Sequence, residues 1–478
     1  MQIVIGLEPL TINLPDDALD GNTLEEAVLK TAHETGCNIM AEILTTIDDR
    51  LFAVHEKQFK STGHRKKTIS TRMGDIEISR RYYMQEDGGY RFLLDEFLGW
   101  DKHQRATGGY MKEALVQASQ HSYRKSQEEM EKQTGAGRSH EGIRAWVKTA
   151  GAEKDEIQAR KTCAVFEHGE SPPGPENIPS RLFVEVDGVN IPTRDGGKVG
   201  KSEMKLCILY PGKEPRYPGG EAYAMRLRNK YVFGGLYSAE DLWDRLAVLG
   251  EEKYGISKIA EIYWGADGAS WCWSGSGNYP GAVLHLCKYH VNREITRVFG
   301  PDREKNREIS ALLESGDRKD VEEFFNRCIV GAYGSVRKGR ERLRKYLLNN
   351  WEGILGWRKI KDILGAEGSL GAIEGNIDKV LARRFKDRGC CWSREGAHAL
   401  SQVRMAWLNG ELDDVLKSLR GSGIEAPVLP PAQRGEKKTV VTGGHYSRCG
   451  SMPALKISIR KPWQKALRGI SNGGCILW

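Results

Sequence analysis

The sequence lacks the features that mark membrane-spanning, exported and disulfide-bonded proteins. No window holds about 18 uninterrupted apolar residues, the length that a spanning helix requires. The N-terminal segment MQIVIGLEPLTINLPDD has neither the basic region nor the small-residue cleavage site of a signal peptide. The ten cysteines include no C-x-x-C pair, which argues against a disulfide scaffold and against a zinc module of paired cysteines. Together these absences predict a soluble protein of the cytoplasm.

The composition is that of a multidomain globular protein. The 478 residues are enough for two to four domains at roughly 100–200 residues each. Apolar side chains make up 39% of the chain and charged side chains 28%, a balance that argues against wholesale disorder. Lys and Arg number 72 against 64 Asp and Glu, which gives a formal net charge of +8. This mild excess fits a nucleic-acid partner but also occurs in enzymes with scattered surface charge.

The first hundred residues contain the signals of a long helix and a hairpin. Thr23-Leu-Glu-Glu26 has the T-x-x-E spacing of a capping box, and apolar residues recur at helical spacing to about Gln58. The segments TISTRM and DIEISRRYYM then flank Gly74-Asp75 and alternate as in a β-hairpin. Three arginines of this hairpin are expected either on a solvated sheet face or in contact with phosphate: Arg72, Arg80 and Arg81.

A pair of helices around a glycine-containing turn is predicted next. Residues 122–133 can form the first helix, Thr134-Gly-Ala-Gly137 breaks it, and Ser139 can cap a second helix that runs through Ala150. The arrangement resembles a helix-turn-helix, although such pairs also serve as plain scaffolding. Its candidate DNA contacts are Arg138, Arg144 and Lys148. The Pro- and Gly-rich residues 168–179 cannot continue a helix and mark a domain boundary.

Beyond this boundary the pattern becomes that of an α/β domain. Strands are expected over residues 182–189, 203–210, 230–235, 259–265 and 282–286. A helix capped at Ser238 separates the third strand from the fourth, and another helix begins near Lys288. Residues 301–365 are charged and helical, and two further helices are predicted over 371–387 and 394–408.

Two aspartates stand at the ends of apolar runs and are each followed by glycine. Asp187 ends the run in LFVEVDG, and Asp267 does the same in IAEIYWGADG. A third acid, Glu374, lies one turn into the helix that starts near Gly371. Taken singly, each acid has an ordinary explanation as a turn residue or a solvated helix residue. Three carboxylates held together would repel one another, and a divalent cation such as Mg²⁺ or Mn²⁺ relieves that repulsion.

The order of these elements is that of ribonuclease-H-like polynucleotidyl transferases: three strands, a helix, a strand with the second aspartate, and a late helix with the glutamate. Several segments resemble bacterial insertion-sequence transposases of the ISLre type, which are distant relatives of the Mutator-like transposases. The segments are VEVDGV, WGADGA, HLCKYHVNREI, KYLLNNWEGI and GAIEGNIDKVLARRFKDRGCCWSREGAHAL. The similarity is collinear over roughly residues 65–410, and RRYY and LDEFLG also resemble the family.

The resemblance implies an α/β, ribonuclease-H-like catalytic domain with a helical insertion. A helical and hairpin region with a helix-turn-helix-like DNA-binding domain would precede it. By this resemblance Asp187, Asp267 and Glu374 are the catalytic DDE triad and ligate Mg²⁺ or Mn²⁺, with two ions expected. The insertion accounts for the 107 residues that separate Asp267 from Glu374. The nearest rival acid, Glu395, follows the capping Ser393 and is expected to complete a helix start.

The resulting division of the chain has seven parts. They are an N-terminal helix and hairpin region (1–104), a helix-turn-helix-like domain (105–160), a linker (161–181), the first part of the catalytic domain (182–300), the helical insertion (301–366), the second part of the catalytic domain (367–412) and a C-terminal tail (413–478).

Cys287-Lys-Tyr-His290 matches a C-x-x-H signature of the Mutator-related transposases. Residues three apart share a face at the start of a helix, so the thiol and the imidazole can meet. We interpret Cys287 and His290 as a pair that organises the site, and the alternative is a buried cysteine beneath a surface histidine. Zinc is not expected, because two ligands do not make a tetrahedral site.

Basic residues gather near the three acids along the sequence. The insertion contains the run Arg337 to Lys345, opposed only by Glu341, in which Arg340 and Arg344 are candidate DNA contacts. Further candidates follow the Glu374 helix: Arg383, Arg384, Lys386 and Arg388. Such runs are usually solvated, but two of them around one metal site favour phosphate contact.

The sequence therefore predicts a DNA transposase that cuts the ends of its own element and joins the freed 3′-hydroxyl to target DNA. DNA is the expected partner, a homo-oligomer is expected because two ends must be paired, and no membrane is involved. One alternative is a ribonuclease-H-like nuclease without strand transfer. Another is an inactive derivative that only binds DNA. RNA binding is a third, although no RRM-like or KH-like signature is present.

Overall fold

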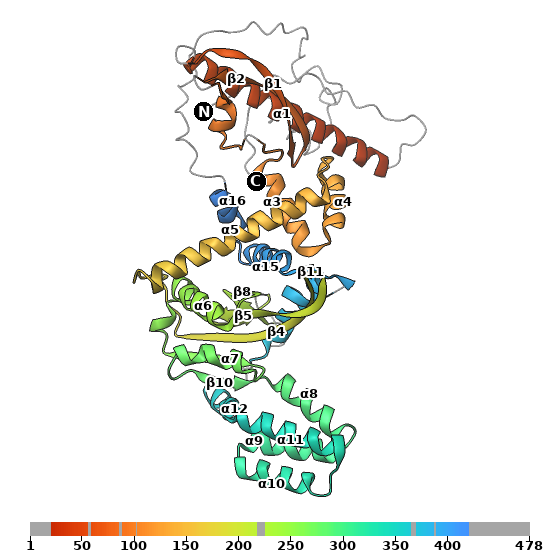
Figure 1. Cartoon of the computed structure of the whole chain (residues 1–478), viewed down its shortest axis with the longest axis vertical. Coiled ribbons are helices and arrows are strands. Elements are labelled where there is room, and N and C mark those ends of the chain that lie inside the picture. Colours follow the sequence, from red (N-terminus) through yellow and green to blue (C-terminus); the bar gives the residue numbers. More distant parts are fainter. Residues whose placement is uncertain are drawn as a thin grey trace, which may run out of the picture. The chain divides into compact units, whose positions relative to one another are not determined.

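The computed structural model describes residues 21–55, 59–85, 88–101, 103–217, 225–364, 370–386 and 389–419. All of them belong to one compact unit, Ile3–Val428. The predicted tail beyond residue 420 lies outside the described residues. The described part is a mixed α/β structure with several sheets (Figure 1). None of its helices combines the length and the apolar character that a membrane crossing requires.

The N-terminal region contains the predicted helix and hairpin. Helix α1 (Gly21–His55) is followed by β1 (Ser61–Thr71), β2 (Gly74–Met84), the short β3 (Tyr90–Arg91) and α2 (Leu93–Phe97). Strands β1 and β2 pair antiparallel, and the turn between them ends at Gly74, whose φ of +136° suits glycine.

Two of the hairpin arginines are bound to carboxylates inside the protein. Arg80 is buried and pairs with the buried Asp95, whose carboxylate also accepts from Lys67 Nζ at 3.1 Å. Arg81 lies 2.8 Å from Asp48 of α1. The expectation of a solvated face or a phosphate contact was therefore wrong for Arg80 and Arg81, because acids from α1 and α2, distant in sequence, neutralise them.

Three helices follow, and the predicted capping residues begin two of them. Helix α3 spans Gly108–Gln120, α4 spans Tyr123–Thr134 with Ser122 as its N-cap, and α5 spans His140–Phe166 with Ser139 as its N-cap. Helix α5 runs 16 residues past the predicted end at Ala150 because its buried face continues through Gly151 and Gln158. A side chain at Gly151 would lie 2.2 Å from the carbonyl oxygen of Ala399, so α5 packs directly on the late helix α15 (Arg394–Leu408).

The central sheet has the strand order β10-β9-β4-β5-β8, with β11 (Trp392–Ser393) paired to β4. Strands β4 (Arg181–Asp195), β5 (Lys198–Tyr210) and β8 (Tyr231–Gly235) are antiparallel neighbours, whereas β9 (Glu261–Ala266) and β10 (Val283–Leu286) run parallel to β4. All five predicted strands are confirmed. The sequence did not predict β11, the length of the β4–β5 hairpin, or the small β6–β7 sheet of Gly212–Pro215 and Met225–Arg228.

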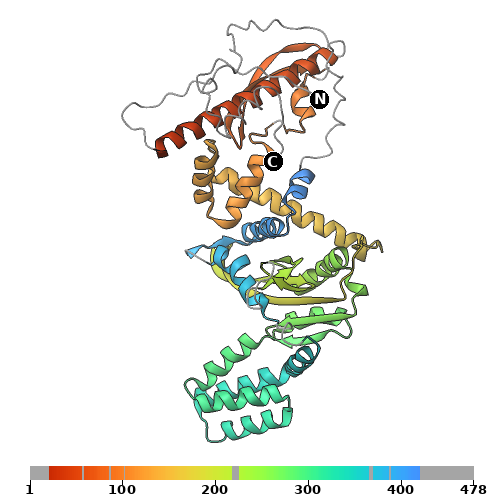
Figure 2. The ribbon, with the colours of Figure 1, turned by 180° about the vertical axis from the view of Figure 1, so that it is seen from behind.

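Helices cover both faces of this sheet (Figure 2). On one face, Val184 and Val186 pack with α6 (Ala239–Tyr254) and with residues of η1 (Ile256–Lys258) and α7 (Ser270–Ser274), which η2 (Gly275–Asn278) follows. On the other face, Phe183 and Val189 share a core with α3, α5, α15 and α16 (Leu412–Leu419). Because side chains alternate along a strand, Glu185 and Asp187 point to this second face.

The predicted helical insertion is present and has a core of its own. The predicted residues 301–366 contain α9 (Arg303–Ser315), α10 (Arg318–Ile329), α11 (Gly334–Asn349) and α12 (Trp351–Leu364). Helix α8 (Lys288–Phe299), which we expected in the catalytic domain, shares their core and is therefore counted with the insertion. Helix α12 returns to the sheet, where a side chain at Gly356 would lie 1.6 Å from the carbonyl oxygen of Leu284. The indole of Trp357 also donates to the Leu286 carbonyl at 2.7 Å. These contacts tie the insertion to the end of β10.

The predicted helix at 371–387 is a continuous helical run with an irregular centre. It begins with α13 (Ala372–Asn376), passes through a π-helical segment η4 (Ile377–Ala382) and ends with α14 (Arg383–Phe385). Short π-helical segments occur often at functional sites. Among the predicted features of this part, Arg388 lies outside the described residues.

Candidate active site

Asp187 and Asp267 are brought together by the register of two parallel strands. Strand β4 pairs with β9 up to Glu185, which lies opposite Gly265. Two residues further along, the same register places Asp187 opposite Asp267. We predicted Asp187 near the end of its strand, and this was wrong, because β4 continues to Asp195 in its hairpin with β5. It is instead just beyond the end of the parallel ladder, and that position brings the two carboxylates together.

Glu374 reaches the same region because a buried carboxylate holds the start of its helix. Glu185 Oε2 accepts hydrogen bonds from the backbone N–H groups of Gly371 at 2.8 Å and Ile373 at 3.2 Å, and Oε1 accepts from Ala372 at 3.3 Å. The Tyr210 hydroxyl donates to Glu185 Oε1 as well. A carboxylate at a helix N-terminus satisfies free N–H groups and interacts favourably with the helix dipole. Glu185 therefore fixes Glu374 relative to the strand that carries Asp187.

Sequence reasoning missed Glu185. The residue is 1% exposed and lies inside the run LFVEVDG, which we interpreted as simply apolar. A charged residue in the middle of an apolar run was the available signal, because charges are rarely buried without a partner. The partners, however, lie 186 to 188 residues further along the chain.

His290 lies between the acids. Its Nδ1 is 2.9 Å from Glu374 Oε1. This contact is an ion pair, because the geometry at Nδ1 does not meet that of a hydrogen bond. The Cys287 thiol donates to the same Glu374 oxygen at 3.3 Å. One group of ligand atoms within 4.8 Å of one another contains Asp187, Asp267 and His290, and another contains Cys287, His290 and Glu374. Cys287 and His290 meet, as predicted, and the His290 side chain is only 12% exposed.

The acids and the histidine shift one another's protonation. Burial, followed by the charge of Asp267, raises the pKa of Asp187 to about 7. Burial lowers the pKa of His290, but contacts with Cys287 and Glu374 and the nearby negative charges outweigh it and raise that pKa to about 10. Burial raises the pKa of Glu374, but His290 outweighs it and leaves the pKa below the usual value. An imidazolium thus neutralises a cluster of carboxylates.

The donor chemistry fits a divalent cation. Asp187 and Asp267 offer carboxylate oxygens, the ligands that Mg²⁺ and Mn²⁺ prefer. Among the described residues the three acids alone do not form a group within 4.8 Å, because the imidazole lies between Glu374 and the aspartates. The expectation that only two zinc-type ligands are available here was wrong, since Glu374 adds a third donor to Cys287 and His290.

The turn that carries Asp267 is tied to the insertion. Its carboxylate accepts from the Ala269 backbone at 2.9 Å and from the Cys272 thiol at 3.3 Å. The Tyr346 hydroxyl of α11 donates to the backbone carbonyl of Asp267 at 2.7 Å. At Gly268 the φ is +99° and a Cβ would lie 2.8 Å from the Tyr346 ring, so this turn requires glycine.

Three of the predicted DNA contacts make internal hydrogen bonds. Arg138 donates to the Ser70 hydroxyl at 2.8 Å and to the Arg105 carbonyl at 2.7 Å. Arg340 donates to the Cys328 carbonyl and lies over the ring of Phe299. Arg384 is 6% exposed and donates to the Ala118 carbonyl at 3.0 Å. A DNA contact requires a side chain that reaches the surface, which the buried Arg384 does not do.

The other predicted contacts lie at or near the surface. Lys148 pairs at 2.9 Å with Glu395, the rival acid, which is therefore occupied away from the aspartates and follows the N-cap Ser393 as expected. Arg144 pairs with Glu141 and Arg383 with Asp378, each at 2.7 Å. Arg344 is partly exposed and Lys386 is exposed. Their contacts with DNA stay predictions.

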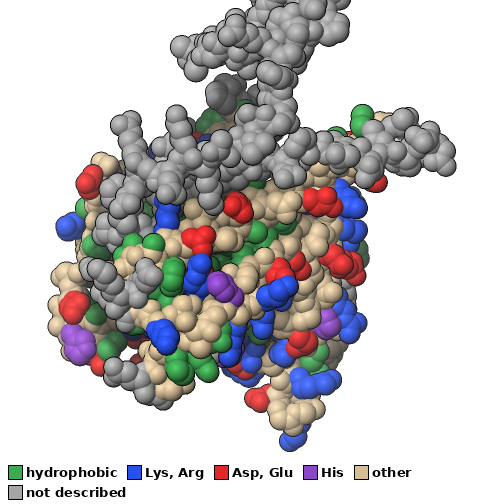
Figure 3. Space-filling view, turned by 90° about the horizontal axis from the view of Figure 1, so that it is seen from above, with side chains coloured by type: hydrophobic (Ala, Val, Ile, Leu, Met, Phe, Trp, Pro, Cys, Tyr) green, Lys and Arg blue, Asp and Glu red, His purple; other side chains and the backbone are tan. Residues whose placement is uncertain are grey.

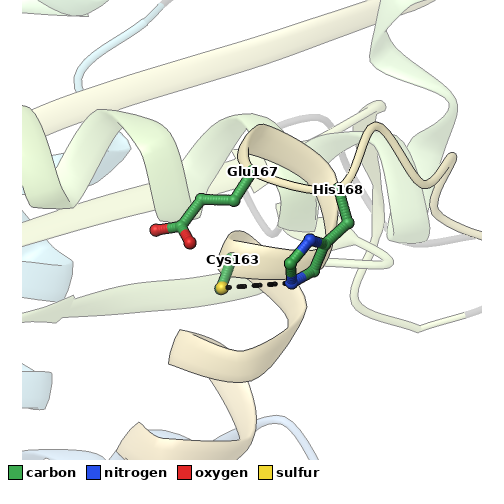
Figure 4. A group of neighbouring side chains, drawn as sticks. All are labelled: Cys163, Glu167 and His168. Carbon is green, nitrogen blue, oxygen red and sulfur yellow. Dashed lines mark hydrogen bonds between the residues drawn. The ribbon is translucent and has the colours of Figure 1, made fainter.

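Two further views show features that we do not assign to the site. On the face in Figure 3, basic and acidic side chains are interspersed where grey atoms do not cover it. At the end of α5, the Cys163 thiol lies 4.0 Å from His168 Nε2, with Glu167 beside them (Figure 4). These three residues come from one helix end, and Glu167 and His168 are exposed. The residues around Asp187 come instead from the turn after β9, the start of α8 and α13.

Comparison with known proteins identifies the family. A model of an uncharacterised protein family, UPF0236, matches residues 14–417. The chain belongs to the UPF0236 family. Two UPF0236 proteins of Caldanaerobacter subterraneus subsp. tengcongensis are each 28% identical to it over 352 residues, 72% of this chain and 68% or 69% of theirs. One is named TTE2489, and the name of the other joins eleven locus designations, from TTE0033 to TTE2212. The UPF0236 match spans every residue of the candidate site.

Proposed function

We propose that this UPF0236 chain is a DNA transposase of an insertion sequence. The observation that carries the proposal is the placement of Asp187 and Asp267 side by side at the end of a parallel ladder, with Glu374 held beside the same strand by Glu185. The sheet order β8-β5-β4-β9-β10, antiparallel in its first three strands and parallel in the rest, supports a ribonuclease-H-like domain. The α4–α5 pair would belong to the DNA-binding part.

Asp187, Asp267 and Glu374 would hold Mg²⁺ or Mn²⁺. When bound, the cation supplies positive charge at the phosphate under attack and at the attacking oxygen. The protein's own residues hold the acids in place: the ladder positions the aspartates, Glu185 positions Glu374, and Tyr346 fixes the backbone at Asp267. His290, protonated between them, keeps mutually repelling carboxylates together before DNA arrives.

A multicopy relative is a second support. One UPF0236 protein in Caldanaerobacter carries eleven locus designations in one name, which is expected of a gene that copies itself within a genome. Repetition of this kind favours a transposase over a nuclease with a single cellular task.

The test is a cleavage and joining assay with the full chain. We expect Mg²⁺ or Mn²⁺ to be required for a cut at the ends of the element, and a labelled end with a free 3′-hydroxyl to become joined to plasmid DNA. Cleavage without joining would favour the nuclease. Binding without any metal-dependent cleavage would favour the inactive derivative, and neither outcome is compatible with a transposase.

A cation should also stabilise the fold, and more so at higher pH. The pKa of Asp187 is raised to about 7, against roughly 3.9 for an unfolded aspartate. Between pH values of about 3.9 and 7 the native state therefore binds one proton that the unfolded state does not. The free energy of unfolding therefore falls as pH rises through this window, by about 4 kcal/mol at roughly 1.36 kcal/mol per unit. The raised pKa of His290 acts in the same direction at higher pH.

We therefore expect a larger Mn²⁺-induced rise in melting temperature near pH 8 than near pH 5. Asp187→Asn should remove most of that rise and should be more stable than the parent near pH 8 without metal. A cation at about 100 times its Kd contributes about 2.7 kcal/mol. The control is Asp195→Asn, at the exposed end of the same strand. Equal shifts in the parent and in Asp187→Asn would contradict the ligand assignment.

A further inference from the structure

A cleft with a volume of about 660 Å³ opens beside Asp267 and His290. Its walls are α8 and α11 of the insertion, which pack on each other through Val291, Ile295 and Leu343. The sequence predicted phosphate contact for the run Arg337 to Lys345, but neither the sequence nor the proposed triad assigns a role to Arg293 and Arg297 of α8. One end of the cleft is the candidate active site itself, because Asp267 and His290 are among its lining residues.

Three arginines line the cleft, and they outnumber the two acids among its lining residues, Asp267 and Glu294. Arg293 and Arg297 lie one turn apart on α8, and both approach the same carboxylate, that of Glu294, at 3.8 and 3.4 Å. Their side chains are 54% and 76% exposed, so neither is committed to the core. Arg342 of α11 is exposed and, among the described residues, makes no ion pair or hydrogen bond.

The basic surface continues beyond the cleft. A shallower groove on α11 is lined by Lys338, Arg342 and Lys345, with Glu341 as its acid. Arg342 lines both hollows, so basic side chains outnumber acidic ones from α8 to the outer face of α11, where Glu294 and Glu341 are the acids among the lining residues. A row of guanidinium and ammonium groups at helical spacing is suited to successive phosphates of a polynucleotide.

We propose that this cleft, here called the insertion cleft, binds the phosphate backbone of one DNA strand that leads away from the cleaved bond. The proposal rests on the proposed transposase function, because it takes the cut to occur at Asp187 and Asp267. Because the cleft has a volume of only about 660 Å³ and lies between two helices in contact, it suits a single strand rather than a duplex. Arg293, Arg297 and Arg342 contact phosphate, a contact that positions the strand without reading its sequence.

The experiment measures binding of two labelled ends by fluorescence anisotropy over a series of salt concentrations. One end is a blunt duplex and the other carries a single-stranded extension. The parent protein should bind the extended end more tightly. Arg342→Ala and Arg297→Ala should each reduce that preference several-fold and lower the salt-dependence slope by about 0.7 for each phosphate that the variant no longer binds.

Two control variants separate the insertion cleft from general surface charge. Arg318→Ala, an exposed residue of α10 that pairs with Glu322 of the same helix, should leave both affinities unchanged. Arg327→Ala, exposed on the same helix and paired with Glu308 of α9, lines neither hollow and should do the same. An unchanged slope for Arg342→Ala, an equal effect of Arg327→Ala, or equally weakened binding of blunt and extended ends would each overturn the proposal. Melting temperatures of all variants verify folding.

Failure of this inference is distinguishable from failure of the proposed function. If the parent cuts and joins DNA but Arg342→Ala binds the extended end like the parent, the function stands and the insertion cleft is wrong. If the parent never cuts DNA but the arginine variants lose their preference for the extension, the cleft binds a strand and the transposase assignment is wrong.

Discussion

Asp187→Ala should abolish metal-dependent DNA cleavage while leaving binding to the ends nearly intact. The substitution removes one of two carboxylates that the β4–β9 register places together, and with it the cation's support of charge at the phosphate. We expect the cleavage rate to fall at least about 1,000-fold, since several kcal/mol at 1.36 kcal/mol per factor of ten give this magnitude. A single-turnover cleavage assay measures the rate, and an electrophoretic shift measures binding.

Asp195→Ala is the matched control, because Asp195 lies on the same strand but is exposed. It should cut at the parental rate. If Asp187→Ala still cuts DNA in Mg²⁺, the assignment of the acids is incorrect. If it loses binding and cleavage together, the aspartate supports the DNA-binding surface and not the chemistry.

Glu185→Gln should reduce cleavage about 100-fold through its effect on Glu374. The glutamine side chain has one acceptor oxygen in place of two, so the three N–H groups of Gly371, Ala372 and Ile373 cannot all be satisfied. A shift of the order of 1 Å in a positioned group can lower a rate by this factor. Glu185 is a positioning residue, since no contact places it on the reacting atoms.

The readout for this role is the Mn²⁺ concentration at half-maximal cleavage, which Glu185→Gln should raise. Tyr210→Phe removes one hydrogen bond to the same carboxylate but keeps the three backbone bonds, and should have a small effect. The double variant Glu185→Gln/Glu374→Gln should be no slower than Glu374→Gln alone, because Glu185 acts only through Glu374. An additive decrease in rate, or a lower melting temperature with an unchanged metal requirement, would indicate a purely structural role.

The sequence predicted the local elements well, because hydrophobic period and capping residues determine them. The strands around Asp187 and Asp267, the caps at Ser139 and Ser393 and the insertion were all anticipated. Pairings between distant segments were not. Glu185 was missed because its partners lie at the start of α13, and the position of His290 between the acids follows from the packing of α8 against the sheet.

Contacts between distant segments also explain why the sequence prediction was wrong for several arginines. Arg80, Arg81 and Arg384 look like surface charges in the sequence, yet acids or carbonyl groups from other elements satisfy them. The sequence shows how many basic residues a run contains, but not which of their side chains point to the surface and which point inward. Arg340 and Arg342 illustrate this, since one turns inward to Cys328 and the other faces the cleft.

The hydrogen bond from Tyr346 to the Asp267 backbone has a mechanical consequence. Tyr346 in the last turn of α11 holds the backbone of one acid, while the other acid, Asp187, is held opposite Leu206 in the β4–β5 ladder. A displacement of α11 along its axis would therefore move Asp267 relative to Asp187 and change the distance between the two carboxylates. In the proposed transposase, a strand bound in the insertion cleft would therefore act on the distance between the two carboxylates.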